Sequence, residues 1–204
     1  YGNGRIVDNT GGMYEPVLTP RSSNDAYIMI PEWTDDKVYL FNAQNGDLVD
    51  ANFIPTTAPQ LQSPKNALLH FSGRYLLVSD QISDVVQKFD TNGTYIGVFC
   101  PVGGPITTIV DNMRSVTYRI NKNTLVTVGS GANQNTVQQF DSGGVHIGTF
   151  ASTGINSPFD VLIRSTDILI SNSGGTNRIT RYDANGTFLS NFYTGSSFAF
   201  PEQL

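Results

Sequence analysis

The chain has 204 residues, with 12 Lys and Arg against 17 Asp and Glu, which gives a net charge of -5 at pH 7. This acidic balance argues against a nucleic-acid backbone or an anionic membrane as the main partner. The longest apolar runs, of four or five residues, are too short to span a bilayer. Only 14% of the residues are charged, a composition common in secreted and surface-exposed β-proteins, so we expect a secreted, cell-surface or periplasmic location.

The two ends of the sequence and its single cysteine add three expectations. The chain opens at Tyr1 without Met or a signal peptide and closes on FAFPEQL, which looks like the start of a further repeat. We therefore expect either a processed protein or a segment of a longer one. One cysteine, Cys100, cannot form an intrachain disulfide and excludes a zinc site of the CxxC type. We expect it to be a small buried residue at a strand end; a reactive or intermolecular thiol is the alternative.

Short runs of Val, Ile, Thr, Tyr and Phe between turn residues predict strands along the whole chain. In chain order they fall into four units of four strands. The first two units are predicted at 17–20, 26–30, 37–41 and 47–53, then at 66–71, 75–79, 84–89 and 94–99. The other two are predicted at 114–120, 124–128, 136–140 and 145–150, then at 159–164, 167–171, 178–182 and 187–192.

One phrase returns at the end of each unit. It reads KFDTNGTYIGVF at 88–99, QFDSGGVHIGTF at 139–150 and RYDANGTFLSNF at 181–192, with a weaker copy, LFNAQNGDLVDANF, at 40–53. Its aromatic anchors stand at positions 41, 89, 140 and 182, so that successive anchors are 48, 51 and 42 residues apart. This period, with several short strands in each unit and no amphipathic helical pattern, is typical of the blades of a β-propeller.

The phrase has a structural explanation. Asn92-Gly93, Gly143-Gly144 and Asn185-Gly186 supply the positive φ angles of tight hairpin turns. The preceding Asp can accept hydrogen bonds from the turn backbone, and the aromatic residue should be buried between neighbouring sheets. Asp-x-Asn-Gly also resembles the start of a calcium loop, but the later oxygen ligands are missing, so calcium is the weaker interpretation. Asn92 and Asn185 are also N-glycosylation acceptors if the host glycosylates.

Residues 157–192 resemble the NHL repeat of β-propellers, through Asn177-Arg178-Ile179, Tyr182-Asp183 and Gly186. The similarity extends in outline over about 14–204. It implies an all-β fold of the six-bladed TolB-like and lactonase-like superfamily, a β-propeller of four-stranded antiparallel blades, with about four blades in this chain. These form a single propeller domain or segment at 1–204, with blades at about 14–53, 64–99, 112–150 and 157–192, and 200–204 starting a further blade.

Propellers place binding groups on one rim, in the loops between the second and third strands. Aligning the ends of the second strands puts Glu32, Asp80, Ser130 and Asn172 at one repeated position. One interpretation is that these side chains satisfy the hydrogen-bonding groups of the loop backbone. The alternative is that they form a polar mouth that binds a cation, with Ca²⁺ possible, or a hydroxylated ligand. Trp33 beside Asp35 and Asp36 could stack on a sugar or a protein partner, or pack between blades. The candidate ligand-binding residues are Glu32, Trp33, Asp35, Asp36, Asp80 and Asn172.

A catalytic role has less support. Related six-bladed lactonases bind a metal near the starts of the first strands, where the residues after the leading prolines are Val17, Lys65, Phe159 and Glu202, and only Glu202 could be a ligand. The two histidines, His70 and His146, fall on different strands of different units. We therefore expect a non-catalytic module that binds a protein or carbohydrate-like ligand, with no cofactor beyond possible calcium. Part of a metal-dependent lactonase-type hydrolase is the alternative. Self-association, or further blades, could complete the ring.

Overall fold

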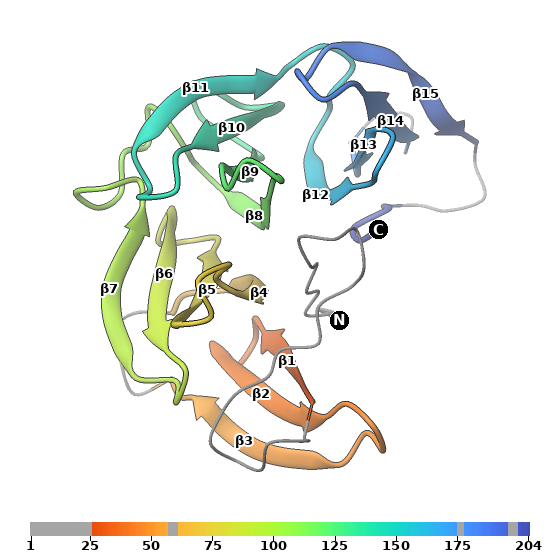
Figure 1. The fold of residues 1–204 in the computed structure, drawn as a ribbon. Helices are drawn as coiled ribbons and strands as arrows, with labels where there is room; N and C mark the ends of the chain where they lie inside the picture. Colours follow the sequence, from red (N-terminus) through yellow and green to blue (C-terminus); the bar gives the residue numbers. More distant parts are fainter. Residues whose placement is uncertain (1–25, 57–60, 175–177, 196–199) are drawn as a thin grey trace.

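The structure is a computed structural model that describes residues 26–56, 61–174, 178–195 and 200–204. Four antiparallel sheets follow one another along an arc, with the first strand of each nearest the middle and the last outermost (Figure 1). The described residues contain no helix, and hence none long and apolar enough to cross a membrane. The all-β propeller expected from the sequence is confirmed, with four blades.

Each complete sheet is a meander of four strands in chain order. The first sheet shows three strands, β1 (Tyr27–Glu32), β2 (Lys37–Asn42) and β3 (Leu48–Ile54); the strand predicted at 17–20 lies outside the described residues. The second sheet consists of β4 (Pro64–Leu69), β5 (Tyr75–Asp80), β6 (Val85–Asp90) and β7 (Tyr95–Cys100). The third consists of β8 (Met113–Tyr118), β9 (Thr124–Val128), β10 (Thr136–Phe140) and β11 (His146–Ala151). The fourth consists of β12 (Pro158–Ile163), β13 (Ile168–Asn172), β14 (Arg178–Tyr182) and β15 (Phe188–Thr194).

The hydrophobic core consists of three layers, one between each pair of neighbouring sheets. Phe89 packs with Val38 and Leu40 of the first sheet, and Phe140 and Tyr182 lie in the two corresponding layers further along the arc. These three of the four aromatic anchors are fully buried, as predicted, whereas the fourth, Phe41 of the first sheet, is half-buried. Cys100 is likewise a buried free cysteine at the end of β7. The aromatic of each repeated phrase therefore attaches its sheet to the sheet before it.

The Asp of each phrase holds the hairpin turn. Asp90 Oδ1 accepts hydrogen bonds from the backbone N–H of Asn92 at 2.9 Å and of Thr94 at 2.8 Å. Asp141 and Asp183 accept the equivalent pairs of bonds in the third and fourth sheets. A carboxylate that accepts two backbone donors fixes the turn between the third and outermost strands.

The glycine of each phrase meets two requirements at once. Gly144 has a φ of 88°, which side chains disfavour, and a Cβ placed on it would lie 1.9 Å from the carbonyl oxygen of Phe99 in the preceding sheet. Gly93 and Gly186 approach the carbonyls of Phe53 and Phe150 in the same way. The turn therefore also docks against the neighbouring sheet, and only glycine permits that approach.

Two further sets of contacts join neighbouring sheets on the opposite side of the arc from these turns. Directly before β2, β6 and β10, a residue with positive φ accepts a hydrogen bond from the N–H of the residue that precedes the first strand of the next sheet. We call these contacts the loop latches. They join Asp36 to Ser63 at 2.6 Å, Asp84 to Asn112 at 2.7 Å and Asn135 to Ser157 at 2.7 Å.

A hydroxyl in the second strand supplies the other set. Ser79 Oγ accepts the Asn66 N–H of its own sheet at 3.0 Å and donates to the Arg114 carbonyl of the next sheet at 2.7 Å. Thr127 makes the equivalent pair of contacts. Ser171 repeats them and donates to the Glu202 carbonyl at 3.3 Å, which places the C-terminal segment against the fourth sheet. These contacts hold the start of each first strand, and with it the lining of the mouth.

Candidate functional site

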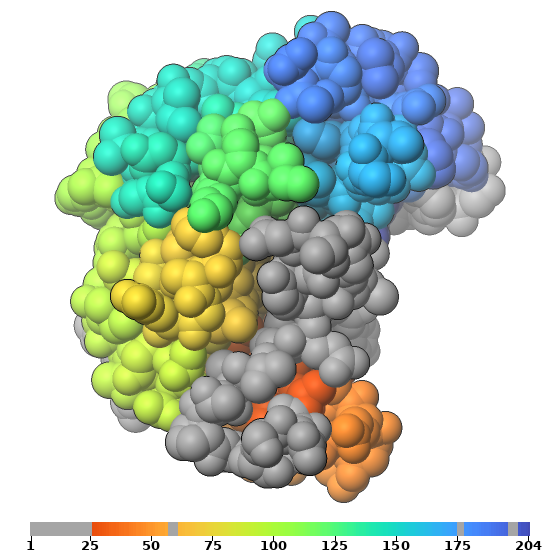
Figure 2. All heavy atoms as spheres, viewed as in Figure 1, coloured from red at the N-terminus to blue at the C-terminus, as the bar shows by residue number. Residues whose placement is uncertain are grey.

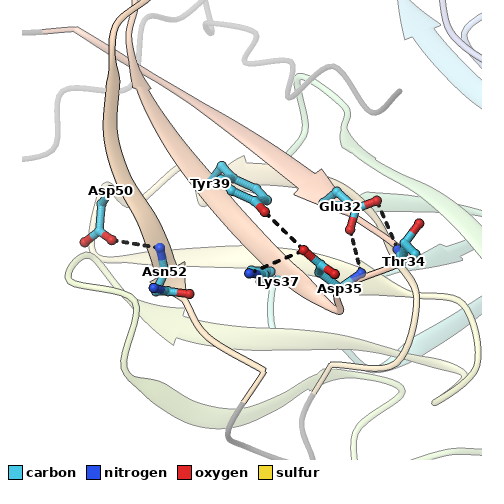
Figure 3. Close-up of polar contacts among 7 residues, drawn as sticks. All are labelled: Glu32, Thr34, Asp35, Lys37, Tyr39, Asp50 and Asn52. Carbon is cyan, nitrogen blue, oxygen red and sulfur yellow. Dashed lines mark hydrogen bonds and ion pairs between the residues drawn. The ribbon is translucent and has the colours of Figure 1, made fainter.

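Glu32 and Asp35, two of the predicted ligand-binding residues, are tied to their own loop (Figure 3). The Glu32 carboxylate accepts hydrogen bonds from the N–H of Thr34 at 3.1 Å and of Asp35 at 2.5 Å. Asp35 in turn accepts a bond from the Tyr39 hydroxyl at 3.2 Å and lies 3.4 Å from the Lys37 ammonium. Both carboxylates thus shape the loop between β1 and β2.

Asp80 and Asn172 lie at equivalent positions, and both are fully buried. Asp80 accepts hydrogen bonds from the N–H of Gln62 at 2.7 Å and of Ser83 at 3.2 Å, and Asn172 Oδ1 accepts one from Asn156 at 2.8 Å. Burial raises the pKa of Asp80 to about 6, against the lowering effect of the backbone donors. The two side chains fasten the segment that leads into each first strand.

The third member of that repeated position is Val128, and the alignment that placed Ser130 there was wrong. Val128 pairs with Met113 and Thr136 as Asp80 pairs with Pro64 and Val85. β9 ends before the Gly-Ser-Gly of its loop, so Ser130 lies two residues beyond the strand end. With an apolar side chain at this place in one sheet, the position does not form a polar ring.

Trp33 differs from the other predicted residues. Its side chain is 55% exposed, and it lines a pocket of about 570 Å³ at the mouth of the arc. The Lys65 ammonium lies 4.5 Å from the centre of the Trp33 ring, a cation–π distance. Asp36, three residues further on, forms the first loop latch. Of the six predicted residues, Trp33 is the one that the structure places in the pocket lining.

Four residues of the pocket occupy one repeated position. Lys65, Arg114 and Phe159 are the second residues of β4, β8 and β12, and Glu202 follows Pro201 as Lys65 follows Pro64. The sequence carried this signal, because three of the four follow a leading proline. Only the metal-binding potential of that position was considered, and Arg114 was missed because Met113 replaces the proline in the third sheet.

Neutral groups hold the Arg114 side chain in the pocket lining. Its guanidinium donates to Ser157 Oγ at 2.8 Å and Ser173 Oγ at 3.2 Å in the fourth sheet, and to Asn112 Oδ1 at 3.3 Å. It also lies 5.2 Å from the centre of the Phe159 ring. These contacts orient the guanidinium but leave its charge without neutralisation.

The electrostatics of the pocket follow from these contacts. Burial lowers the pKa of both Lys65 and Arg114, while the Glu202 carboxylate acts in the opposite direction on each. Neither cation forms an ion pair with a carboxylate of the described residues. In a chain of net charge -5, two cations and one carboxylate thus face the same cavity. An anion entering it would meet partly desolvated donors, where charge-assisted hydrogen bonds are strongest.

Elsewhere, the described ranges contain no group of three or more His, Cys, Asp and Glu side chains able to hold a metal ion. His70 Nδ1 lies 2.8 Å from Ser72 Oγ, a spacing seen between a nucleophile and its base. The Ser72 N–H donates to that same nitrogen, His70 Nε2 contacts the Tyr75 hydroxyl at 2.9 Å, and burial lowers the pKa of His70 to about 4. These contacts close the turn between β4 and β5. His146 lies in the third sheet, away from His70, and contacts Gln138 of that same sheet.

No protein-family model matches the sequence, and no curated protein is similar to it. Among solved structures, a chain of a nidogen–laminin complex is 13% identical with a TM-score of 0.52, matching 94% of this chain and 79% of its own length. A candidate gluconolactonase is 11% identical with a TM-score of 0.64, matching 96% and 65%. A streptogramin B lyase is 11% identical with a TM-score of 0.58, matching 98% and 54%.

Identities this low show the fold alone. The chain spans less than two thirds of the gluconolactonase-like protein and about half of the lyase. The propeller fold that the sequence suggested through its NHL-like repeats is therefore shared with lactonase-like and lyase propellers, and the six blades of that superfamily are not seen among the four sheets described here.

Proposed function

We propose that this propeller is a non-catalytic binding module whose mouth takes a small acidic, carbohydrate-like ligand. One observation carries the proposal: Lys65 and Arg114 occupy the same position in consecutive sheets, face one pocket, and lack an ion-pair partner among the described residues. Guanidinium and ammonium groups placed together suit a carboxylate or phosphate.

The rest of the lining favours a hydroxylated body for that ligand. The cavity of about 570 Å³ lies in the range of small-molecule sites. Gln81, Ser157 and Ser173 contribute polar groups to it, and Trp33 contributes a partly exposed aromatic ring. Such a mixture of amide, hydroxyl and aromatic groups matches the alternating polar and apolar surface of a sugar. A secreted or surface-exposed location, which we also propose, would bring the module into contact with such ligands.

Two other functions are less well supported. A protein partner at the rim would use Trp33 together with the loop carboxylates, but Glu32 and Asp35 already accept loop hydrogen bonds. A lactonase-type hydrolase would need several oxygen ligands for a metal at the first-strand starts. Lys65, Arg114 and Phe159 stand there with Glu202, and two cations at such a place repel a metal ion.

Calorimetric titration with galacturonate, galactose and Ca²⁺ would test the proposal. We expect galacturonate to bind, galactose to bind at least about tenfold more weakly because one charge-assisted interaction is lost, and Ca²⁺ to give no saturable heat. Lys65→Met should abolish the preference for the acid. Lys88→Met is the matched control, since the Lys88 ammonium lies 5.4 Å from the Tyr75 ring centre but outside the pocket.

The same titration can contradict the proposal in two ways. Equal binding of galacturonate and galactose, or an equal loss in the Lys65 and Lys88 variants, would remove the basis for an anion site. Saturable binding of Ca²⁺ without sugar binding would instead favour the cation at the rim that the loop carboxylates suggested.

A further inference from the structure

Three positions near the turn between the first and second strands can be compared from sheet to sheet. They are the residue after the first strand, the residue before the aromatic anchor, and the residue before that anchor's partner in the second strand. In the fourth sheet these positions hold Arg164, Arg181 and Asp167. Asp167 is buried and forms an ion pair with each arginine. The charges at this turn are therefore largely compensated within the sheet.

The third sheet lacks that compensation. The same positions hold Arg119, Gln139 and Asn123, and the Arg119 guanidinium donates to Gln139 Oε1 at 2.6 Å. It also donates to the Ala184 carbonyl and lies 4.8 Å from the centre of the Phe150 ring. Each of these partners is neutral, so Arg119 is held in place with its charge uncompensated.

The second sheet has aromatic rings at this end instead of a carboxylate. His70, Lys88 and Tyr75 occupy the three positions, and the His70 ring lies 3.9 Å from the centre of Phe71 and 4.0 Å from that of Tyr75. The Lys88 ammonium lies 5.4 Å from the centre of the Tyr75 ring. The Lys122 ammonium, from the β8–β9 turn of the third sheet, lies 5.4 Å from the centre of the Phe71 ring. The two neighbouring turns thus form one surface with a lysine on each side of the rings.

The cations of this surface have no ion-pair partner. Among the residues that the structure describes, no carboxylate forms an ion pair with Lys88, Arg119 or Lys122. Asp90 and Asp141 supply negative charge on this side of the sheets, but each is bound to two backbone N–H groups of its own hairpin turn. Uncompensated positive charge therefore gathers at two turns of a chain whose net charge is -5.

An apolar side chain lies within the same surface. Ile120, between Arg119 and Lys122 in the β8–β9 turn, is 81% exposed, the largest value among the described large hydrophobic residues. Lys122 and Arg74 are also exposed. The two turns, in yellow and green, lie on the face seen in Figure 2. We use the name turn surface for Phe71, Arg74, Lys88, Arg119, Ile120 and Lys122.

We propose that the turn surface docks a short acidic segment of a partner protein. Its carboxylates would pair with the cations, and an apolar side chain between them would pack on Ile120. Arginine, aromatic and exposed aliphatic groups together are typical of protein interfaces. A short segment is favoured over a nucleic acid, because the local cations act within a Debye length of about 8 Å whereas the net charge of the whole chain repels a long polyanion. The surface lies at the opposite end of the sheets from the mouth, so both sites can be occupied together.

Fluorescence anisotropy of three labelled peptides of equal length tests this proposal. In the first peptide glutamate alternates with leucine, in the second glutamate alternates with serine, and in the third lysine alternates with leucine. We expect the first to bind saturably and the second at least about fivefold more weakly, because the apolar contact with Ile120 is lost. The third should not bind. Added salt should weaken binding of the first peptide.

Substitutions locate the binding. Lys122→Glu and Ile120→Asn should each weaken binding of the first peptide at least about fivefold. Ile82→Asn should have no effect, since Ile82 is 65% exposed but lies in the β5–β6 loop on the mouth side. Lys65→Met should also have no effect, which separates the turn surface from the cations of the mouth. Urea unfolding of each variant shows that it is folded.

Four results would overturn the proposal. They are no saturable binding of the first peptide, equal binding of the lysine peptide, equal losses in the Ile120 and Ile82 variants, and a loss in the Lys65 variant as large as in the Lys122 variant. Binding of single-stranded oligothymidylate that is abolished by Lys122→Glu, without binding of the first peptide, would assign the surface to a nucleic acid instead.

Discussion

The hairpin side and the mouth side of the same four sheets follow different rules. On the hairpin side the repeated position keeps its residue: Asp90, Asp141 and Asp183 accept the same pairs of backbone hydrogen bonds. On the mouth side the second residue of each first strand changes from sheet to sheet: Lys65, Arg114, Phe159 and then Glu202. Both positions are held in register by equally regular contacts between the sheets.

This difference separates scaffold from site. A residue that must satisfy the same backbone geometry in every sheet is restricted to one chemical type. A position whose backbone is held by its neighbours is free to vary, and repetition brings its variants around one cavity. In this fold, binding specificity therefore resides at positions whose backbone is held by the same contacts in every sheet but whose side chain differs from sheet to sheet. Substitutions in the scaffold should therefore change stability, and substitutions in the pocket should change binding.

The largest effect is expected from the aromatic anchor. Phe140→Ala should lower the free energy of unfolding by about 3–5 kcal/mol, because it leaves a cavity between two closely packed sheets. Phe41→Ala, at the same position in the first sheet, should cost less than half as much, since Phe41 is only half-buried. Urea unfolding of the two variants measures both values. Equal losses would mean that the repeated aromatic acts within its own sheet and not between sheets.

The hairpin glycines should come next. Gly144→Ala should cost about 3 kcal/mol: about 1 kcal/mol for an alanine at positive φ and the rest for displacing the Phe99 carbonyl. Gly46→Ala shares the first cost but not the second. Thermal unfolding of the two alanine variants therefore isolates the contact between sheets. If both lose the same stability, the close approach does not determine the need for glycine.

The pH dependence of stability should separate two buried groups. The pKa of His70 falls from 6.5 to about 4 on folding, so its contribution is present above pH 6.5 and is lost as the pH falls towards 4. The pKa of Asp80 rises from 3.8 to about 6, so its protonation on folding opposes that loss over the same interval. Between pH 7 and pH 5, His70→Gln should gain about 2 kcal/mol relative to wild type. A parallel pH profile for the two proteins would contradict a neutral buried His70.

The smallest effects are expected when a residue of the loop latches and a residue of the pocket are substituted and compared. Asp84→Ala should cost about 1–2 kcal/mol, because the Asn112 N–H loses its acceptor between two sheets. Lys65→Met should change stability by less than about 0.5 kcal/mol, because Lys65 is not part of the latches. Chemical unfolding of both variants gives the comparison. A larger loss for the Lys65 variant would assign that residue to the scaffold.

Most of the fold could be predicted from the sequence, because the strongest local signals and the overall architecture agree. The Asp-x-x-Gly turns predicted the hairpins, the repeated aromatic predicted burial of Phe89 and Phe140 between sheets, and the period of the aromatics indicated blades. The alignment of Ser130 failed where the Gly-Ser-Gly loop carries no strand signal. The loop latches formed by Asp36 and Asp84 were not predicted, because an aspartate that precedes a strand is equally typical of a turn residue and of a surface charge.

The candidate site was less predictable for a physical reason. Polar residues at strand ends attract attention as ligand groups, yet Asp80 and Asn172 are needed to satisfy buried backbone N–H groups. Lys65 and Arg114 appeared to be ordinary charges, since nothing local shows that they face the same cavity. Their convergence depends on how successive sheets pack around the mouth. The sequence could identify Trp33, because a single tryptophan in a polar loop is conspicuous on its own.

Trp33 provides the most direct test of the mouth as a binding site. It is the single tryptophan of the chain, and it lies in the pocket against the Lys65 ammonium, so its emission reports on that cavity alone. Titration of the wild-type protein with galacturonate should give a saturable change in tryptophan fluorescence, and galactose at the same concentrations should give a much smaller one. No change with galacturonate, or the same change with both sugars, would contradict the assignment of this pocket as an anion-binding site.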